Sequence, residues 1–212
     1  MTERMPMFRL GLTGGIAAGK STVGARWRAA DVAVVEADDL AHRALEPETQ
    51  THQEIVKTFG PGVRNADGTI NRSRLGEIVF SDERKRLALN QIVHPAVRRM
   101  WQETLDRLEA GGRTRTVVLC IPLLYEVGAE TEMDGVVVVG CSEQTQMARL
   151  AAKGLDAAQA GARIKSQDPI QKKMDKADFV IWNDGSLRVL AEQADIIWDT
   201  IKENHHAPNQ RQ

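Results

Sequence analysis

The sequence predicts an α/β fold in which a five-stranded parallel sheet is covered by helices on both faces. Two observations predict this class. Five short apolar runs are rich in Val and Ile and mostly lack polar alternation, which is typical of strands buried on both faces. Helical stretches lie between these runs, as right-handed crossovers require. The expected strands are residues 8–13, 32–37, 116–121, 135–141 and 179–183.

The first expected strand leads into a glycine-rich segment that reads Gly-Gly-Ile-Ala-Ala-Gly-Lys-Ser. It matches the phosphate-loop pattern G-x-x-x-x-G-K-[ST], and its place between a strand and a helix is the context that the pattern requires. A plain glycine turn is the alternative, and the complete motif in this context disfavours it. The candidate nucleotide-binding residues here are Gly14, Gly15, Ala17, Ala18, Gly19, Lys20, Ser21 and Thr22.

The chemistry of this segment indicates ATP and Mg²⁺. Glycines let backbone N–H groups turn toward a phosphate, and the N-terminus of the following helix adds positive potential. Lys20 can reach the β- and γ-phosphates, and the Ser21 hydroxyl can ligate Mg²⁺. A switch GTPase would also need D-x-x-G and N-K-x-D segments, and the sequence contains neither.

The second expected strand ends in three acids, Glu36, Asp38 and Asp39. Strand ends in open α/β sheets face the ligand crevice, so we expect Asp38 to meet the ligands. A carboxylate there can accept the proton of an attacking hydroxyl or help hold Mg²⁺ and its waters. The alternative is that the acids merely favour the start of the next helix, which suits Asp39.

The interval between the second and third strands is too long for a plain crossover and reads as helices. We expect a helical insertion over residues 51–113, with a turn at 65–68. A capped helix start is expected at 81–83, and Pro95 is expected to open another helix that ends at 111–112. The nucleotide-binding core would then comprise residues 1–50, 114–141 and 176–212.

Two short helices are expected after the fourth strand, the first capped by Ser142 and running to Gly154, the second running from Asp156 to about residue 167. Together, residues 142–175 are predicted to form a lid. Closure of a lid places positive charge on the phosphoryl oxygens and excludes water.

The cations of this lid support the interpretation. Arg149 and Lys153 are four residues apart and are expected to share a face of the first helix. Arg163 and Gln167 are also four residues apart and are expected to share a face of the second helix. A solvated basic helix is the alternative.

Composition limits the partners and the compartment. The 28 basic and 29 acidic residues nearly balance, which disfavours a dedicated nucleic-acid or membrane-surface protein. Cys120 and Cys141 lie beside apolar runs and suit a reducing compartment. The first six residues lack the apolar stretch of a signal peptide, and no segment approaches the ~20 apolar residues of a membrane span. We therefore expect a cytoplasmic protein with no nucleic-acid or membrane partner, and the sequence leaves open whether it is a monomer or a small homo-oligomer.

Further short segments continue the pattern along nearly the whole chain: residues 11–15, 36–38, 46–47, 59–60, 67–68, 74–75, 79–80, 92–95 (Ile-Val-His-Pro), 121–126 (Ile-Pro-Leu-Leu-Tyr-Glu), Gln146, 149–150, Arg163, Gln167 and 177–183. In this order they resemble the dephospho-coenzyme A kinase family. The His-Pro and Pro-Leu-Leu-aromatic-Glu elements are more specific than the phosphate loop itself.

The resemblance implies a P-loop kinase that transfers phosphate from ATP to the ribose 3′-hydroxyl of dephospho-coenzyme A, the last step of coenzyme A synthesis. It implies that the insertion holds this acceptor and that Asp38 is the catalytic base. For His94 and Glu126 a structural role is the alternative. The site residues implied beyond the loop are Lys20 and Arg149 for catalysis, Arg149, Lys153 and Asn183 for ATP, and Asp38, His94, Leu123, Glu126 and Arg163 for the acceptor.

Four positions depart from the family pattern. Ala17 replaces a usual glycine, which is harmless if its backbone angle is not left-handed. Glu36 replaces a common aspartate and keeps its charge, moved by one methylene. Cys120 stands where many relatives have aspartate, so a contact near the magnesium ion would come from Asp38 or Glu126 or be absent. Lys153 replaces a lid arginine and offers a point charge instead of a fork.

Two rival functions share much of this pattern. Another small-molecule kinase, acting on a nucleoside monophosphate or a sugar acid, would share the loop, base and lid and differ in the insertion. A nucleotide-dependent regulatory or binding protein would have no metabolite acceptor, and Asp38 with the cationic lid disfavours it.

Overall fold

The computed structural model describes residues 6–30, 32–112 and 114–206, without the side chains of residues 205 and 206. The expectation that the first six residues form no signal peptide falls mostly on residues 1–5, and these lie outside the described residues. The chain forms two compact units, one made of residues up to 35 and from 108 onward, the other of Glu36–Arg107. Each unit is described by itself.

Five strands and nine α-helices, with two short 3₁₀ helices, are assigned within the described residues. Their order is β1 (Phe8–Gly14), α1 (Lys20–Ala29), β2 (Ala33–Glu36), α2 (Ala37–Ala44), α3 (Gln50–Phe59), η1 (Pro61–Val63), α4 (Arg72–Phe80), α5 (Glu83–Gly111), β3 (Thr116–Cys120), η2 (Ala129–Glu132), β4 (Gly135–Gly140), α6 (Glu143–Ala151), α7 (Ala157–Lys165), α8 (Ile170–Met174), β5 (Phe179–Trp182) and α9 (Leu187–His206).

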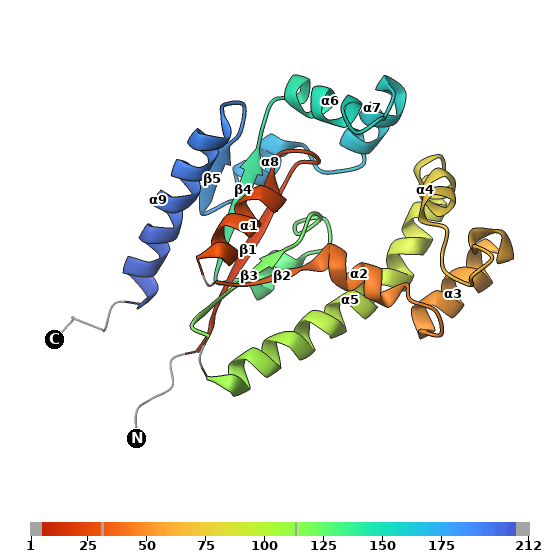
Figure 1. The fold of residues 1–212 in the computed structure, drawn as a ribbon, viewed down its shortest axis with the longest axis horizontal. Coiled ribbons are helices and arrows are strands. Elements are labelled where there is room, and N and C mark those ends of the chain that lie inside the picture. Colours follow the sequence, from red (N-terminus) through yellow and green to blue (C-terminus); the bar gives the residue numbers. More distant parts are fainter. Residues whose placement is uncertain (1–5, 31, 113, 207–212) are drawn as a thin grey trace. The chain divides into compact units, whose positions relative to one another are not determined.

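The strands form one sheet in the order β2-β3-β1-β4-β5, with β1 at its centre (Figure 1). Strand β1 runs parallel to β3, pairing Leu10 with Val118, and parallel to β4, pairing Leu12 with Val137. The expected five-stranded parallel sheet is therefore confirmed. The expected strand ends are within one residue of the observed ones, and the second strand gives way to α2 already at Ala37.

Helices α1 and α9 pack against each other beside the sheet in the first unit (Figure 1). Trp27 of α1 is 1% exposed, and its ring centroid lies 5.9 Å from that of Trp198 on α9. Its indole Nε1 donates to the carbonyl of Ala194 at 3.1 Å, so the one polar atom of the buried ring is satisfied. These contacts join a core built on Leu10, Leu12, Val118, Val137, Val139 and Ile181, which packs α1 against the sheet.

Strand β5 forms one edge of the sheet. Its neighbour β4 lies on one side, with Gly140 paired to Trp182. On the other side, Gln193 of α9 accepts a hydrogen bond from the Trp182 N–H at 3.0 Å and donates one to the Trp182 carbonyl at 3.0 Å. Gln193 therefore binds both main-chain groups of Trp182 that β4 leaves unused.

The second unit has a core of its own, made of Ile55, Val63, Ile70, Leu75 and Val79. Helix α3 begins after Thr49, whose side chain accepts from the His52 N–H at 3.1 Å. The expected turn at 65–68 is confirmed, because the Gly68 N–H donates to the Asn65 carbonyl at 3.1 Å.

The expected break at Pro95 is wrong, because α5 runs unbroken from Glu83 to Gly111. Its start was expected correctly: the Asp82 carboxylate accepts from the N–H groups of Arg84 at 2.9 Å and Lys85 at 3.3 Å. Proline removes one helical hydrogen bond. Pro95 and Gln91, four residues earlier, are both exposed, so water can replace the lost donor. The following turns bury Ala96, Val97, Trp101 and Leu105, which holds the helix together. None of the described helices is long and apolar enough to cross a bilayer.

Candidate active site

The phosphate loop connects β1 to α1, and its glycines are required by close approaches of other groups. Gly14 has φ 158, and a Cβ there would overlap the carbonyl oxygen of Val139. Gly19 has φ 105, and a Cβ there would overlap the side-chain amide of Asn183. Helix α1 begins at the next residue, Lys20, which is 9% exposed. The loop is thus a backbone cradle at a helix N-terminus, as anion binding requires.

Ala17 lies in the left-handed region with φ 57. The condition under which alanine would be harmless here is therefore not met. A residue with a Cβ costs roughly 1–2 kcal/mol more than glycine in this conformation. The surroundings hold it in place, since Arg149 Nη1 donates to the Ala17 carbonyl at 3.0 Å.

Side chains distant in the sequence bind consecutive main-chain groups of the loop. Gln146 Nε2 donates to the Ile16 carbonyl at 2.8 Å, and Gln167 Oε1 accepts from the Ile16 N–H at 2.8 Å. Asn183 Nδ2 donates to the Ala18 carbonyl at 2.7 Å. The expected lid and the end of β5 therefore both contribute to the shape of the loop.

Arg149 and Asn183 were predicted to bind ATP, and the structure brings both to the loop. Arg149 Nη2 donates to the Asn183 carbonyl at 2.9 Å while its Nη1 binds Ala17. Each terminal nitrogen carries a second hydrogen, so the guanidinium can hold the loop and still face a phosphate. The cation is thereby fixed beside the cradle.

The expected lid helices are present but shorter than predicted. Ser142 caps α6, which ends at Ala151, and Asp156 forms a capping box at the start of α7, which ends at Lys165. Gly154, with φ 84, follows the first of these ends, where the Leu155 N–H donates to the Leu150 carbonyl at 3.2 Å.

These earlier ends change the position of two predicted residues. Lys153 lies in the exposed turn after α6, so the expectation that it shares a helix face with Arg149 is wrong. Gln167 likewise lies beyond α7 and does not share a face with Arg163, which is half-buried within α7. Gly154 turns the chain between the two helices, which explains the early end of α6.

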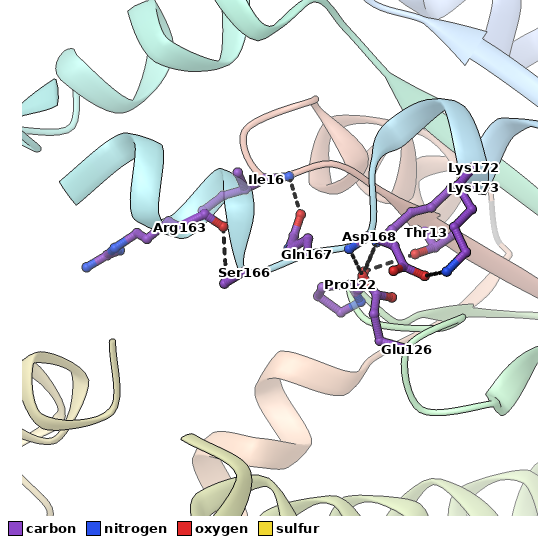
Figure 2. Close-up of polar contacts among 10 residues, drawn as sticks. All are labelled: Thr13, Ile16, Pro122, Glu126, Arg163, Ser166, Gln167, Asp168, Lys172 and Lys173. Carbon is purple, nitrogen blue, oxygen red and sulfur yellow. Dashed lines mark hydrogen bonds and ion pairs between the residues drawn. The ribbon is translucent and has the colours of Figure 1, made fainter. Parts of the chain in front are cut away.

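The Pro-Leu-Leu-Tyr-Glu segment after β3 is tied to the chain that follows α7 (Figure 2). Lys173 Nζ lies 2.7 Å from Glu126 Oε1 and donates to the Pro122 carbonyl at 3.2 Å. The same Glu126 oxygen accepts from the Asp168 N–H at 2.9 Å, and Thr13 Oγ1 donates to the Pro122 carbonyl at 3.1 Å. Glu126 thus makes structural contacts, and its role toward the acceptor stays a prediction.

Two further residues of this segment have different surroundings. Leu123 is half-buried, so part of its side chain remains accessible. Tyr125 is buried, and burial, with smaller effects from Asp178 and Glu130, raises the pKa of its phenol to about 12. The phenol therefore stays protonated near neutral pH and serves as a packing group.

The second unit contains the predicted base. Strand β2 ends at Glu36, and Asp38 and Asp39 lie in the first turn of α2, where both are exposed. The expected strand 32–37 ends one residue early, so Asp38 lies two residues beyond β2, in a helix that starts at Ala37. Carboxylates in the first turn of a helix interact favourably with its dipole, which explains the early start.

His94, also in the second unit, lies in the middle of α5 instead of at the expected helix end. It is half-buried, and burial lowers the pKa of its imidazole below the ordinary value. The neutral form is therefore favoured, as suits a hydrogen-bonding residue more than a cation.

One residue of this site was not anticipated from the sequence. The Lys173 side chain is 0% exposed. In the sequence it stands among Lys172, Asp175 and Lys176, where it reads as one more solvated charge. Gln146 was named only as part of a family pattern, and Gln167 only there and as a neighbour of Arg163 on the expected lid helix. Neither was predicted to contact the loop. A contact between an amide side chain and a main-chain group leaves no spacing signal.

The central β1 strand, the glycine loop leading into α1 and the arginine that α6 places against this loop together define a P-loop kinase. A shikimate kinase from Bacteroides thetaiotaomicron shares this fold, with a TM-score of 0.50 at 15% identity over 92% of this chain and 99% of that one. Residues 8–188 match the family model described as dephospho-CoA kinase. The chain belongs to the dephospho-CoA kinase family.

Individual relatives agree with this assignment. A dephospho-CoA kinase from Geobacillus kaustophilus is 42% identical over 197 residues, covering 91% of this chain and 98% of the relative. One from Anaeromyxobacter dehalogenans is 46% identical over 187 residues, covering 88% of each chain. The solved dephospho-CoA kinase of Campylobacter jejuni superimposes with a TM-score of 0.67 at 28% identity, covering 92% of this chain and 98% of that one.

Proposed function

We propose that this chain transfers the γ-phosphoryl group of ATP to the ribose 3′-hydroxyl of dephospho-coenzyme A, giving coenzyme A and ADP. The family match over residues 8–188 carries this proposal. A member of this family is a kinase that uses ATP and acts on a small-molecule acceptor, in the final step of coenzyme A biosynthesis. The loop geometry supports the nucleotide half of the reaction.

Asp38, Lys20 and Arg149 have different roles in the phosphoryl transfer. The acceptor oxygen forms a bond to the γ-phosphorus as the bond from that phosphorus to the β–γ bridging oxygen breaks, and ADP leaves. Asp38 accepts the proton of the acceptor hydroxyl. Lys20 and the N–H groups of the loop bind the transferred charge, and Arg149 adds a fixed cation beside them.

The remaining expected contacts are part of the same proposal. Thr22 and Asn183 hold the nucleotide, and Lys153 reaches it from the turn after α6. His94, Leu123, Glu126 and Arg163 contribute to acceptor binding. The segments that supply them are the insertion over 51–113, the chain after β3 and the lid over 142–175.

The residues at the loop fit a magnesium ion that is held largely by phosphates. Among the described residues, no group of three or more His, Cys, Asp or Glu side chains is placed to bind a metal. Ser21 is exposed in the first turn of α1, directly after the phosphate loop. Magnesium typically uses one or two protein ligands besides phosphates and water. When bound, the ion neutralises phosphate charge, and Ser21 would be its ligand.

We also place this reaction in the cytoplasm. Cys120 and Cys141 are both buried and are not joined in a disulfide, and burial raises the pKa of the Cys141 thiol. Thiols of this kind persist in a reducing compartment.

A coupled ADP-release assay tests the proposal with purified protein, Mg²⁺-ATP and three kinds of acceptor: dephospho-coenzyme A, nucleoside monophosphates and gluconate. We expect ADP release with dephospho-coenzyme A alone and coenzyme A as the product detected by mass spectrometry. Turnover with another acceptor would keep the kinase and overturn the acceptor. A Lys20→Ala variant is the control for contaminating kinases, and absence of any turnover would favour a nucleotide-binding protein.

A further inference from the structure

Ile16, in the middle of the phosphate loop, has both of its main-chain polar groups bound by lid glutamines. Its carbonyl accepts from Gln146 Nε2 and its N–H donates to Gln167 Oε1, both at 2.8 Å. A carbonyl can only accept and an N–H can only donate, so the backbone dictates the orientation of each amide. Gln146 acts as a donor and Gln167 as an acceptor.

We propose that Gln146 and Gln167 are positioning residues that hold the phosphate loop in its nucleotide-binding shape through Ile16, and thereby couple nucleotide binding to the lid. The proposal rests on the kinase function above and deepens it. Neither residue needs to touch the substrate, since each acts through the backbone of the loop.

The packing around Gln146 supports a specific fit. The residue is 5% exposed although its side chain is polar. A Cβ on Gly15 would lie 2.6 Å from Gln146 Nε2, closer than real Cβ atoms come to other atoms. A side chain at Gly15, the residue after the first motif glycine, would therefore displace the Gln146 amide from its present place.

The main chain that carries Gln167 is anchored independently of the loop (Figure 2). The next residue, Asp168, donates its N–H to Glu126, which pairs with the buried Lys173. Lys173 also binds the Pro122 carbonyl, which accepts from Thr13, one residue before the loop begins. The Gln167 residue, whose side chain accepts from the Ile16 N–H, is therefore held at a fixed place relative to β1.

The phosphate loop needs such support because Ala17, the loop residue after Ile16, is strained. Ala17 has φ 57, and only the contacts around it stabilise this conformation. Loss of either glutamine contact would let residues 16 and 17 relax. The loop N–H groups would then be less well aimed at a phosphate, so nucleotide affinity should fall while acceptor affinity is retained.

Identical substitutions at the two positions should have different outcomes. A glutamate at 167 can still accept from the Ile16 N–H, whereas a glutamate at 146 has no donor and faces a carbonyl. We expect Gln167→Glu to unfold in urea near the wild-type midpoint without nucleotide, and Gln167→Leu at a lower one. Gln146→Glu should unfold at a lower midpoint than Gln146→Leu.

Calorimetric titration with ADP gives a readout that does not depend on the acceptor. We expect Gln146→Leu and Gln167→Leu each to raise the Kd for ADP by about fivefold to tenfold, as loss of one such hydrogen bond implies. The KM for the acceptor should stay unchanged. Gln171→Leu is the matched control, since Gln171 is exposed and its side chain bonds only to the Asp175 side chain among the contacts described for it.

Three results would overturn the proposal: equal midpoints for the two glutamate variants, unchanged ADP affinity in both leucine variants, or an equal loss in the Gln171 control. If Gln146→Leu does not fold, the half-buried Gln167 position alone decides through its leucine and glutamate variants. An enzyme that binds ADP as expected but ignores dephospho-coenzyme A would contradict the proposed function and leave this inference standing.

Discussion

Lys173 Nζ lies 2.7 Å from Oε1 of Glu126, with the lysine side chain 0% and the glutamate side chain 18% exposed. A buried cation is tolerated only when it is paired and hydrogen-bonded, and here the Pro122 carbonyl supplies a further acceptor. The pair joins the chain after β3 to α8 and is the least solvated charge interaction described at this site.

Removal of the cation should destabilise the protein strongly. Lys173→Met leaves Glu126 without its partner, and we expect the free energy of unfolding in urea to fall by about 2–3 kcal/mol, somewhat below the range for fully buried pairs because Glu126 is partly exposed. The double variant Lys173→Met with Glu126→Gln should regain part of this loss. Lys172→Met is the control, because its pair with Asp168 is exposed and should contribute no more than about 0.5 kcal/mol. Equal losses in the two single lysine variants would contradict this account.

Replacement of Ala17 by glycine should stabilise the protein. Relief of the left-handed alanine is worth roughly 1–2 kcal/mol, against about 0.5–1 kcal/mol for the greater freedom of glycine in the unfolded chain. A net gain of up to about 1 kcal/mol in urea unfolding is therefore expected for Ala17→Gly. Ala18→Gly should have the opposite sign, since Ala18 is 1% exposed and not left-handed. A loss of stability in both variants would mean that the left-handed angle is not costly.

Asp38→Asn should abolish most of the turnover and leave ATP binding nearly intact. The amide keeps the shape of the side chain but cannot accept the acceptor proton, and loss of a general base typically costs about 10²–10⁴-fold in rate. Asp39→Asn is the control, because Asp39 is exposed in the same first turn of α2. Loss of nucleotide binding together with turnover would indicate a structural or metal role for Asp38 instead.

The burial of His94 predicts a pH dependence of stability. Its pKa is lowered in the folded state, so the unfolded state binds a proton first as the pH falls. Stability should therefore be fully present above the ordinary histidine pKa of about 6.5 and be lost as the pH falls through the lower folded value. Thermal unfolding between pH 7.5 and 5 should show a flatter profile for His94→Gln than for wild type. A slope for His94→Gln that equals the wild-type slope would exclude His94 as the cause.

The sheet could be predicted because its signals are local. Runs such as Val117–Leu119 and Val136–Val139 are apolar throughout, which is the pattern of strands whose side chains are buried on both faces of a sheet. The course of α5 could not be predicted, since proline normally ends or opens a helix. Whether Pro95 is tolerated depends on tertiary burial on the turns that follow it, which the local pattern does not contain.

The site divides in the same way. The loop, Arg149 and Asn183 were expected and lie together, because a motif and a family pattern specify them. Lys173 was missed because its burial depends on a partner 47 positions earlier in the chain. The left-handed angle of Ala17 was left conditional, since an unconstrained motif position does not report its own backbone angle.

The contacts between Gln193 and Trp182 have a consequence for the behaviour of the protein at high concentration. The edge of an open sheet is a template to which strands of other molecules can add, and the edge strand β5 exposes Val180 and Trp182. Gln193 imitates a neighbouring strand at Trp182 by taking up both its N–H and its carbonyl. The Gln193 amide therefore prevents a strand of another molecule from pairing with β5 at Trp182. This helps to prevent edge-to-edge association of the enzyme at high concentration.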